Sequence, residues 1–407
     1  MYLSGLIHRD RLFDIACRWL ADQPHSRDGR ELTEIFAFER AITAPAVRAL
    51  VADLVRVLQP SPLVLRRVTT KDAVRRAIIE AVKEPSPRAM GLLNRYRENP
   101  EEFFPRTPVH MSLITREDDT LVGMVRRKRI RRIAEKVSRQ VSEQLASEID
   151  AAARSLASQR ALDAGVPLEQ MITSRAEMEC EFAAAERIVA DRIHTGQIVL
   201  DPSRQQVDDV VGVKIIVQSN EIERLEEALD ERENTWAFHR KIHEGYYVGT
   251  HYLVDVELPP VDEIIGSVRH VDWSFASGRG VSVFDLEGGF YEYVSTGSRT
   301  FRLELILTTL EDLVESEFGR GIHETRILEQ RDRASYSGRI AQNASWIIEY
   351  MLHLAISPSI RVDELPIKIW GQYLRDTLYH AIANLNEGEA EEWLVPFESD
   401  GQRRIVL

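Results

Sequence analysis

Apolar residues recur at helical spacing along the first part of the chain. In segments 11–20 and 46–58, hydrophobic side chains fall three and four residues apart, which predicts amphipathic helices. Thr70 is a favourable N-cap for a third helix that runs through Val82. We therefore predict that residues 1 to about 115 are helical, and that a loop rich in proline and acidic residues marks the edge of this region.

The pattern then changes between the strand period and the helix period. Apolar stretches on either side of a polar turn at 117–120 predict one or two strands between Val109 and Val125. Segments 130–164 and 174–194 have helical periodicity and are separated by Pro167, which predicts a helical hairpin. The other predicted elements are strands at 210–217, 250–258 and 301–307, a helix at 221–233, a strand hairpin at 281–294, a helix beginning near Thr309, and two or three helices between 337 and 384.

This order of elements predicts an α/β (α+β) protein in which helices flank a mixed sheet. We assign residues 1–110 to a helical N-terminal domain and residues 111–335 to the sheet domain, with a helical insertion at about 138–200. Residues 336–407 form a helical C-terminal tail in this scheme.

Composition and charge narrow the class of protein. The 407 residues are 44% hydrophobic and 29% charged, which is enough to bury a core. The net charge of −13 argues against nucleic-acid binding over the whole surface, although a local basic groove remains compatible with it. Cys17 and Cys180 lie far apart without metal-ligand spacing, and no apolar run is long enough to span a membrane. We expect a cytoplasmic protein with no membrane partner.

A cluster of cations is the first candidate for chemistry. Six of the seven residues from Arg126 to Arg132 are basic. If a helix begins near Arg129, Arg126 and Lys128 end the preceding strand and Lys136 lies one turn beyond Arg132, so cations gather at a strand-to-helix corner suited to phosphates. The alternative is a solvated basic helix face, or a surface for RNA or a protein partner. In either case we expect the side chains of Arg126 and Lys128 to be exposed.

Two acidic residues are candidate metal ligands. Asp209 opens the predicted strand at 210–217, and Glu304 lies in an otherwise apolar strand, on the same face as Arg302 and Ile306. Magnesium needs only one or two protein carboxylates when phosphates and water complete its ligands. The alternatives are that Asp209 belongs to a polar turn before the strand and that Glu304 is a charge facing a sheet edge.

The remaining candidates are aromatic residues and histidines. Tyr247 and His251 precede a strand, where a tyrosine ring can stack on a base or simply pack in a core. His323 follows the helix that begins near Thr309, and a lone histidine there is more often a core or cap residue than a catalyst. The sequence has no Walker loop, no G-x-S-x-G elbow and no zinc-type His-Glu spacing.

Taken together, these pieces resemble the RelA/SpoT family of alarmone synthetases. Arg126, Lys128 and Lys136 match its R-x-K motif and the second lysine of the following helix. Three further stretches resemble its D-strand, its G-Y-x-S-x-H turn, and its E-x-Q-I-R-T strand with the A-E-x-G-x-A-x-H motif: residues 209–215, 247–251 and 304–323. The family transfers pyrophosphate from ATP to the 3′-hydroxyl of GTP or GDP, on a nucleotidyltransferase-like mixed sheet flanked by helices.

The resemblance implies a role for each matched residue. It implies Mg²⁺ as cofactor, and ATP with GTP, GDP or a related nucleotide as ligands. The roles are ATP phosphate binding for Arg126, Lys128, Lys136 and Lys214; catalysis and Mg²⁺ binding for Asp209 and Glu304; acceptor binding for Tyr247 and His251; and support of the site for Glu317 and His323.

Departures from the family pattern leave alternatives open. Lys214 replaces an arginine, and Ile306 and Thr308 replace the glutamine and arginine that follow the catalytic glutamate. The chain is then a diverged pyrophosphokinase, acting on a nucleotide or on the 3′ end of tRNA, or a degenerate relative that serves as nucleotide sensor, regulator or scaffold. A homo-oligomer is compatible with each. The helix at 186–194 competes with the one at 126–137 for the phosphate-binding position, but it lacks the R-x-K pair.

Overall fold

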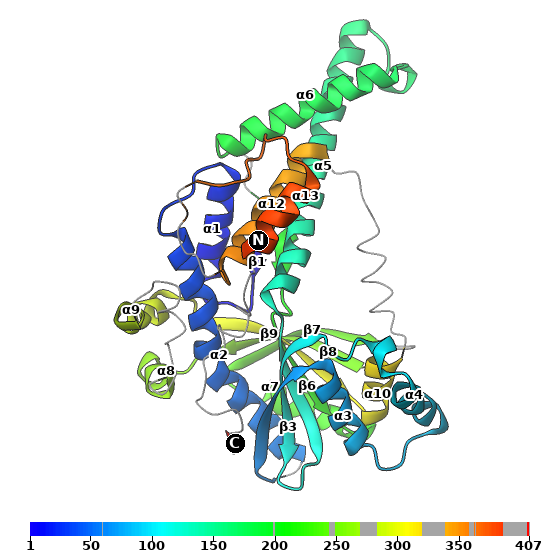
Figure 1. Ribbon diagram of the computed structural model, residues 1–407, viewed down its shortest axis with the longest axis vertical. Helices are drawn as coiled ribbons and strands as arrows, with labels where there is room; N and C mark the ends of the chain where they lie inside the picture. The colour runs from blue at the N-terminus through cyan, green and yellow to red at the C-terminus, as the bar shows by residue number, and fades with distance from the viewer. Residues whose placement is uncertain are drawn as a thin grey trace.

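A single large sheet with helices on both faces organises the chain. The structure, a computed structural model, describes residues 1–58, 60–197, 200–243, 249–268, 283–319, 338–357, 362, 364–385 and 405–406. The mixed α/β class is confirmed (Figure 1). The sheet has eight strands in the order β10-β2-β3-β4-β6-β9-β8-β7, in which only β6 and β9 are parallel neighbours among the described strands. A separate two-stranded parallel sheet joins β1 and β5.

The elements have the following bounds. The strands are β1 Tyr2–Leu3, β2 Leu63–Thr70, β3 Pro108–Arg116, β4 Leu121–Arg127, β5 Gln206–Val207, β6 Val211–Ile216, β7 Thr235–His243, β8 Gly249–Glu257, β9 Thr300–Thr308 and β10 Ile405–Val406. The helices are α1 Arg9–Leu20, α2 Asp28–Leu58, α3 Lys71–Ala81, α4 Pro87–Glu98, α5 Ile130–Ala164, α6 Arg175–His194, α7 Ile222–Asp230, α8 Val261–Val268, α9 Val283–Thr296, α10 Leu310–Phe318, α12 Gly338–Leu354 and α13 Arg375–Leu385.

Local capping signals account for several helix starts that the sequence predicted. The Thr70 hydroxyl accepts a hydrogen bond from the backbone N–H of Ala73 at the start of α3, at 3.3 Å. Ser174 and Glu177 form a capping box at the start of α6. The predicted strands at 210–217, 250–258 and 301–307 are confirmed as β6, β8 and β9.

Three predictions of secondary structure are wrong or incomplete. Strand β2 lies inside the segment predicted to be helical, and it pairs with β3 across the predicted domain boundary. Strand β7 was not predicted, because its half-exposed edge position removes the alternation of apolar residues. The predicted strand hairpin at 281–294 is wrong: helix α9 occupies 283–296, because Phe290 and Tyr293 lie one helical turn apart and both pack on Phe38 of α2, with ring centroids 5.0 Å away.

Two hydrophobic clusters cover the sheet unequally. The larger cluster fills one face, where residues such as Val213, Leu305 and Val254 pack beneath α2, α7 and α8. The smaller cluster lies on the opposite face, between β2, β3, β4 and the helices α3, α4 and α10. In the part of the chain that the structure describes, this smaller cluster includes no residue of β7, β8 or β9. Polar residues of that half of the face include His251, Arg302 and Glu304.

Helices α1, α5, α6, α12 and α13 lie together beyond one end of the sheet (Figure 1). Helix α12 packs along α5, and α1 and α13 pack on α12. The far end of α5 projects from the body together with α6 (Figure 1). The predicted hairpin of two helices is confirmed in α5 and α6. Among the described helices, none combines the length and apolarity needed to cross a bilayer.

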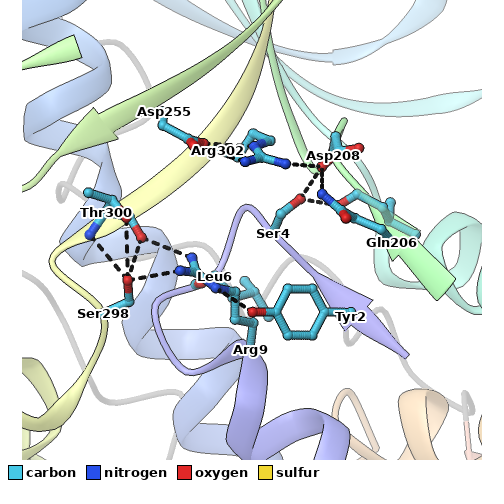
Figure 2. A network of polar contacts seen from close by, with 11 residues as sticks. Tyr2, Ser4, Leu6, Arg9, Gln206, Asp208, Asp255, Ser298, Thr300 and Arg302 are labelled. Carbon is cyan, nitrogen blue, oxygen red and sulfur yellow. Dashed lines mark hydrogen bonds and ion pairs between the residues drawn. The ribbon is translucent and has the colours of Figure 1, made fainter. Parts of the chain in front are cut away.

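Arg302 of β9 fastens the amino-terminal segment to the sheet. Its guanidinium binds both carboxylate oxygens of Asp255 at 2.7 and 2.9 Å and one of Asp208 at 3.2 Å (Figure 2). The Ser4 hydroxyl and the Gln206 side-chain amide both donate to the same oxygen of Asp208, at 2.6 Å each. Asp208 is therefore committed to a structural network, whereas its neighbour Asp209 has different partners.

The buried side chain of Glu39 on α2 also binds the amino-terminal segment. Its carboxylate accepts hydrogen bonds from the backbone N–H groups of Ile7 and His8 at 2.8 to 2.9 Å and from the Tyr293 hydroxyl at 3.0 Å. Burial raises the pKa of Glu39 to about 7, although these hydrogen bonds oppose the shift.

We expect Glu39 to make stability depend on pH. Since its pKa is raised in the folded state, its stabilising contribution is complete below its ordinary value of 4.5 and is lost as the pH rises through about 7. Relative to a Glu39→Gln variant, the unfolding free energy of the wild type should fall by up to about 3 kcal/mol across this window. Denaturant unfolding of both proteins at several pH values measures the difference, and parallel curves would contradict the assignment.

Gly123 permits close contact between β4 and β6. A Cβ atom there would lie 2.6 Å from the carbonyl oxygen of Lys214 and 3.2 Å from Cδ1 of Ile114. We expect Gly123→Ala to cost about 1 to 3 kcal/mol of unfolding free energy, because backbone must move. Gly91→Ala in α4 is the control: no atom lies within 4 Å of its added methyl group, and it should stabilise by about 0.5 to 1 kcal/mol. Equal effects of the two substitutions in denaturant unfolding would refute the argument.

Candidate functional site

Three neighbouring strands align an arginine, a glycine and a glutamate in one row. Arg126 of β4 pairs with Gly212 of β6, and Gly212 pairs with Glu304 of β9. Paired residues face the same side of a sheet, here the side that carries polar groups. A Cβ on Gly212 would lie 3.9 Å from the Glu304 carboxylate and 4.0 Å from the Arg126 guanidinium. The two charged groups therefore converge over the glycine, where no side chain intervenes.

Asp209, just before β6, forms ion pairs with two lysines. It forms an ion pair with Lys128, which follows β4, and its Oδ1 lies 3.3 Å from Nζ of Lys136 on the second turn of α5. Burial favours the neutral carboxyl, but the positive charges of Lys128 and Lys136 outweigh it and lower the pKa of Asp209. Burial also lowers the pKa of Lys128 to about 8, despite the attraction of Asp209. The acid is ionised and the cations lie at its side.

Glu304 pairs with a histidine on β8, and a second histidine on β7 lies against the first. Nδ1 of His251 lies 3.0 Å from Oε1 of Glu304, and the ring of His243 lies 4.4 Å from that of His251, centroid to centroid. Burial would raise the pKa of Glu304, but the hydrogen bond and charge of His251 lower it below the ordinary value. The carboxylate is therefore held ionised and oriented.

Lys214 and Glu317 form a second ion pair on the same face as Arg126, Gly212 and Glu304. Lys214 lies two residues beyond Gly212 on the same face of β6, and its Nζ is 4.0 Å from Oε1 of Glu317 on α10. Burial lowers the pKa of Lys214, although Glu317 opposes the shift. Burial alone would raise the pKa of Glu317, but the positive charge of Lys214 outweighs it, and the pKa is lowered. Both groups also lie within electrostatic range of Arg126.

The structure thus brings together eight of the residues that the sequence singled out. They lie on one polar face at the β4–β6–β9 rows: Arg126, Lys128, Lys136, Asp209, Lys214, His251, Glu304 and Glu317. Tyr247 and His323 lie outside the described residues.

The cations differ from the sequence prediction in their exposure, and their position decides between the two competing helices. The side chains of Arg126 and Lys128 are half-buried rather than exposed, because strand pairing and the Asp209 ion pair enclose them. Of the two competing helices, α5 is the one that brings a lysine, Lys136, to Asp209. In α6, Glu186 instead accepts a hydrogen bond from the backbone of Arg339.

Sequence reasoning missed two members of the site. Gly212 was noted only as part of a motif, although a glycine inside a β-branched strand signals close approach of another group. His243 had no signal, because β7 itself was not predicted. Ile306 and Thr308, which replace the glutamine and arginine of the family pattern, are buried side chains of β9 and are 8% and 5% exposed.

Asp209 and Glu304 are the two acids of this face that the sequence singled out as candidate metal ligands. Among the described residues, no group of three or more His, Cys, Asp or Glu side chains is arranged to hold a metal ion. Asp209 and Glu304 lie within electrostatic range of each other and are both ionised, which fits a magnesium ion that takes its other ligands from phosphate and water.

Comparison of the chain with protein-family models, with curated proteins and with solved structures finds no match.

We expect Asp209 to matter more for folding than either lysine. Asp209→Asn removes the common partner of two cations and should cost about 1 to 3 kcal/mol, whereas Lys128→Gln leaves Lys136 in place and should cost less. Asp150→Asn is the control, since its pair with Arg154 is exposed and should change stability by about 0.5 kcal/mol or less. Denaturant unfolding ranks the three variants. A larger loss of unfolding free energy for Lys128→Gln than for Asp209→Asn would contradict the role of Asp209 as the shared partner of the two lysines.

Proposed function

We propose that the chain is a diverged RelA/SpoT-type pyrophosphokinase on a nucleotidyltransferase-like sheet. The donor is ATP and the acceptor is the 3′-hydroxyl of a guanine or related nucleotide. The observation that carries the proposal is the convergence of Arg126 with Glu304 over Gly212, beside the group of Lys128, Lys136 and Asp209. Cations for a polyphosphate and ionised acids for a metal lie on one rigid face, as phosphoryl-type transfer requires.

The residues have distinct tasks in this proposal. Arg126 supplies a planar fork for phosphate oxygens, and Lys128, Lys136 and Lys214 supply point charges. Asp209 and Glu304 would hold Mg²⁺, which neutralises charge on the phosphates when bound. The acceptor oxygen forms a bond to the β-phosphorus of ATP, and the bond from that phosphorus to the oxygen that bridges the α- and β-phosphates breaks. That oxygen leaves on AMP, and the hydroxyl proton passes to water. Positioning and charge neutralisation supply most of the rate enhancement.

His251 orients Glu304 and borders the space for the acceptor. It comes from β8, and its hydrogen bond to Oε1 fixes the carboxylate on the polar face. The residues before β8, including Tyr247, are the ones that the family resemblance associates with acceptor binding. A free nucleotide and the 3′ end of tRNA both offer the required hydroxyl.

We expect AMP release from labelled ATP when the purified chain, Mg²⁺ and the correct acceptor are combined. The acceptors to compare are GDP, GTP, ATP alone and tRNA. Glu304→Gln should lower the rate by about 10²-fold or more, because it removes a charge at the reacting phosphates. Glu257→Gln, at the exposed end of β8, should leave the rate unchanged. Absence of AMP with every acceptor, or full activity of Glu304→Gln, would reject the pyrophosphokinase.

A nucleotide-binding regulator without turnover is the second candidate. Ile306 favours it, because an apolar side chain lies beside His251 and Lys214 in the register where the family has glutamine. Calorimetric titration with ATP distinguishes the two functions: binding without AMP release indicates a sensor, and absence of binding rejects both. In either functional case, Arg126→Gln should weaken binding about tenfold or more.

A further inference from the structure

An exposed tryptophan lies on the half of the polar face that β7, β8 and β9 form. Trp236 of β7 is 50% exposed, although tryptophan usually buries most of its large ring. β7 is the last strand of the described sheet, and Trp236 pairs with Asp255 of β8, which pairs with Arg302 of β9. Paired residues face the same side of a sheet, so Trp236 shares its face with Glu304, two residues beyond Arg302.

Two groups beside Trp236 are of the kind that stack on flat rings. Phe238 lies two residues beyond Trp236 on the same face of β7, and the guanidinium carbon of Arg302 lies 4.3 Å from the centroid of its ring. Arg302 donates to both carboxylate oxygens of Asp255, at 2.7 and 2.9 Å, which fixes the plane of the guanidinium (Figure 2). Nucleobases stack on aromatic side chains and on arginine guanidinium planes. This part of the face therefore suits a base.

Strand pairing divides this half of the face into three rows. The rows cross β7, β8 and β9 in register: Trp236–Asp255–Arg302, Phe238–Leu253–Glu304 and Lys241–His251–Ile306. A bulge in β7 between Phe238 and Lys241 keeps Lys241 on the same face. Successive rows are about 7 Å apart, because each strand advances by two residues between them. The base, ribose and phosphate of a nucleotide follow one another in the same way.

The second row leads directly into the candidate transferase site. Glu304 pairs onward with Gly212 of β6, and Gly212 pairs with Arg126 of β4. A ribose over this row would therefore lie on the line that joins Glu304 to the cations of the site. The third row adds an exposed cation, Lys241, next to His251. A positive charge at this end of the face complements the phosphate of a nucleotide.

We propose that Trp236 stacks on the base of a free acceptor nucleotide, with the ribose over the second row and the phosphate toward Lys241. The inference rests on the proposed function, which supplies the acceptor. In this placement the 3′-hydroxyl faces Glu304, and the donor phosphates approach from the side of Arg126. Trp236 is a contact in addition to the one that the family resemblance implies for Tyr247, which lies outside the described residues.

Calorimetric titration with GDP and with pyrophosphate, both in Mg²⁺, tests this placement. Trp236→Ala should weaken GDP binding about tenfold or more, because the stacked ring is lost, and should leave pyrophosphate binding unchanged. Trp236→Phe should restore most of the affinity, since a phenyl ring still stacks. Trp370→Ala is the matched control: this ring lies between α12 and α13, is 42% exposed, and should leave both titrations unchanged. Trp236 is exposed, so its variants should fold, which denaturant unfolding checks.

These measurements separate the base site from the transferase. If GDP binding depends on Trp236 but no AMP is released from ATP, the base site stands and the pyrophosphokinase is rejected. If AMP is released and Trp236→Ala keeps the wild-type KM for the acceptor, the pyrophosphokinase stands and the base site is overturned. The base site is also overturned if the wild type does not bind GDP, if Trp236→Ala binds it as the wild type does, or if Trp370→Ala weakens binding equally.

Discussion

The parallel pairing of β6 with β9 is the constraint on which the candidate site depends. It sets Gly212 opposite Glu304, and β4 then sets Arg126 opposite Gly212. Apolar residues fix this register, because Val213 and Leu305 lie in the core on the other face. A shift of one residue would turn Glu304 into that core and expose its leucine neighbours. The charged row is therefore held by hydrophobic burial on the reverse side of the same strands.

Electrostatic compensation then keeps the half-buried charges ionised. Asp209 is shared by two lysines, Glu304 is oriented by His251, and Lys214 faces Glu317. Each group alone would lose much of its charge on burial, but each has a neighbour of opposite sign. The result is a polar face that contains ionised groups of both signs.

Strand β4 divides its two arginines between different environments. Arg126 lies near Glu304 on the polar side, whereas Arg127 donates hydrogen bonds to the Thr43 hydroxyl and the Arg40 carbonyl oxygen on α2. The alternation of side chains along a strand makes this separation inevitable. One short basic segment of sequence thus contributes to two distinct surfaces. The same strand carries Gly123, whose missing side chain permits the tight contact with β6.

Local signals in the sequence determined much of this protein. The helix cap at Thr70, the helical periodicity of 174–194 and the short β-branched stretch at 210–217 were sufficient to predict elements, and motif spacing selected most residues of the polar face. Tertiary structure decided what local periodicity cannot encode. Strands β2 and β7 exist because neighbouring strands supply their hydrogen bonds, and α9 is helical because Phe290 and Tyr293 pack on α2. The contact of Arg127 with Thr43 and with the Arg40 carbonyl oxygen likewise depends on packing between segments distant in sequence, which only the folded chain brings within range.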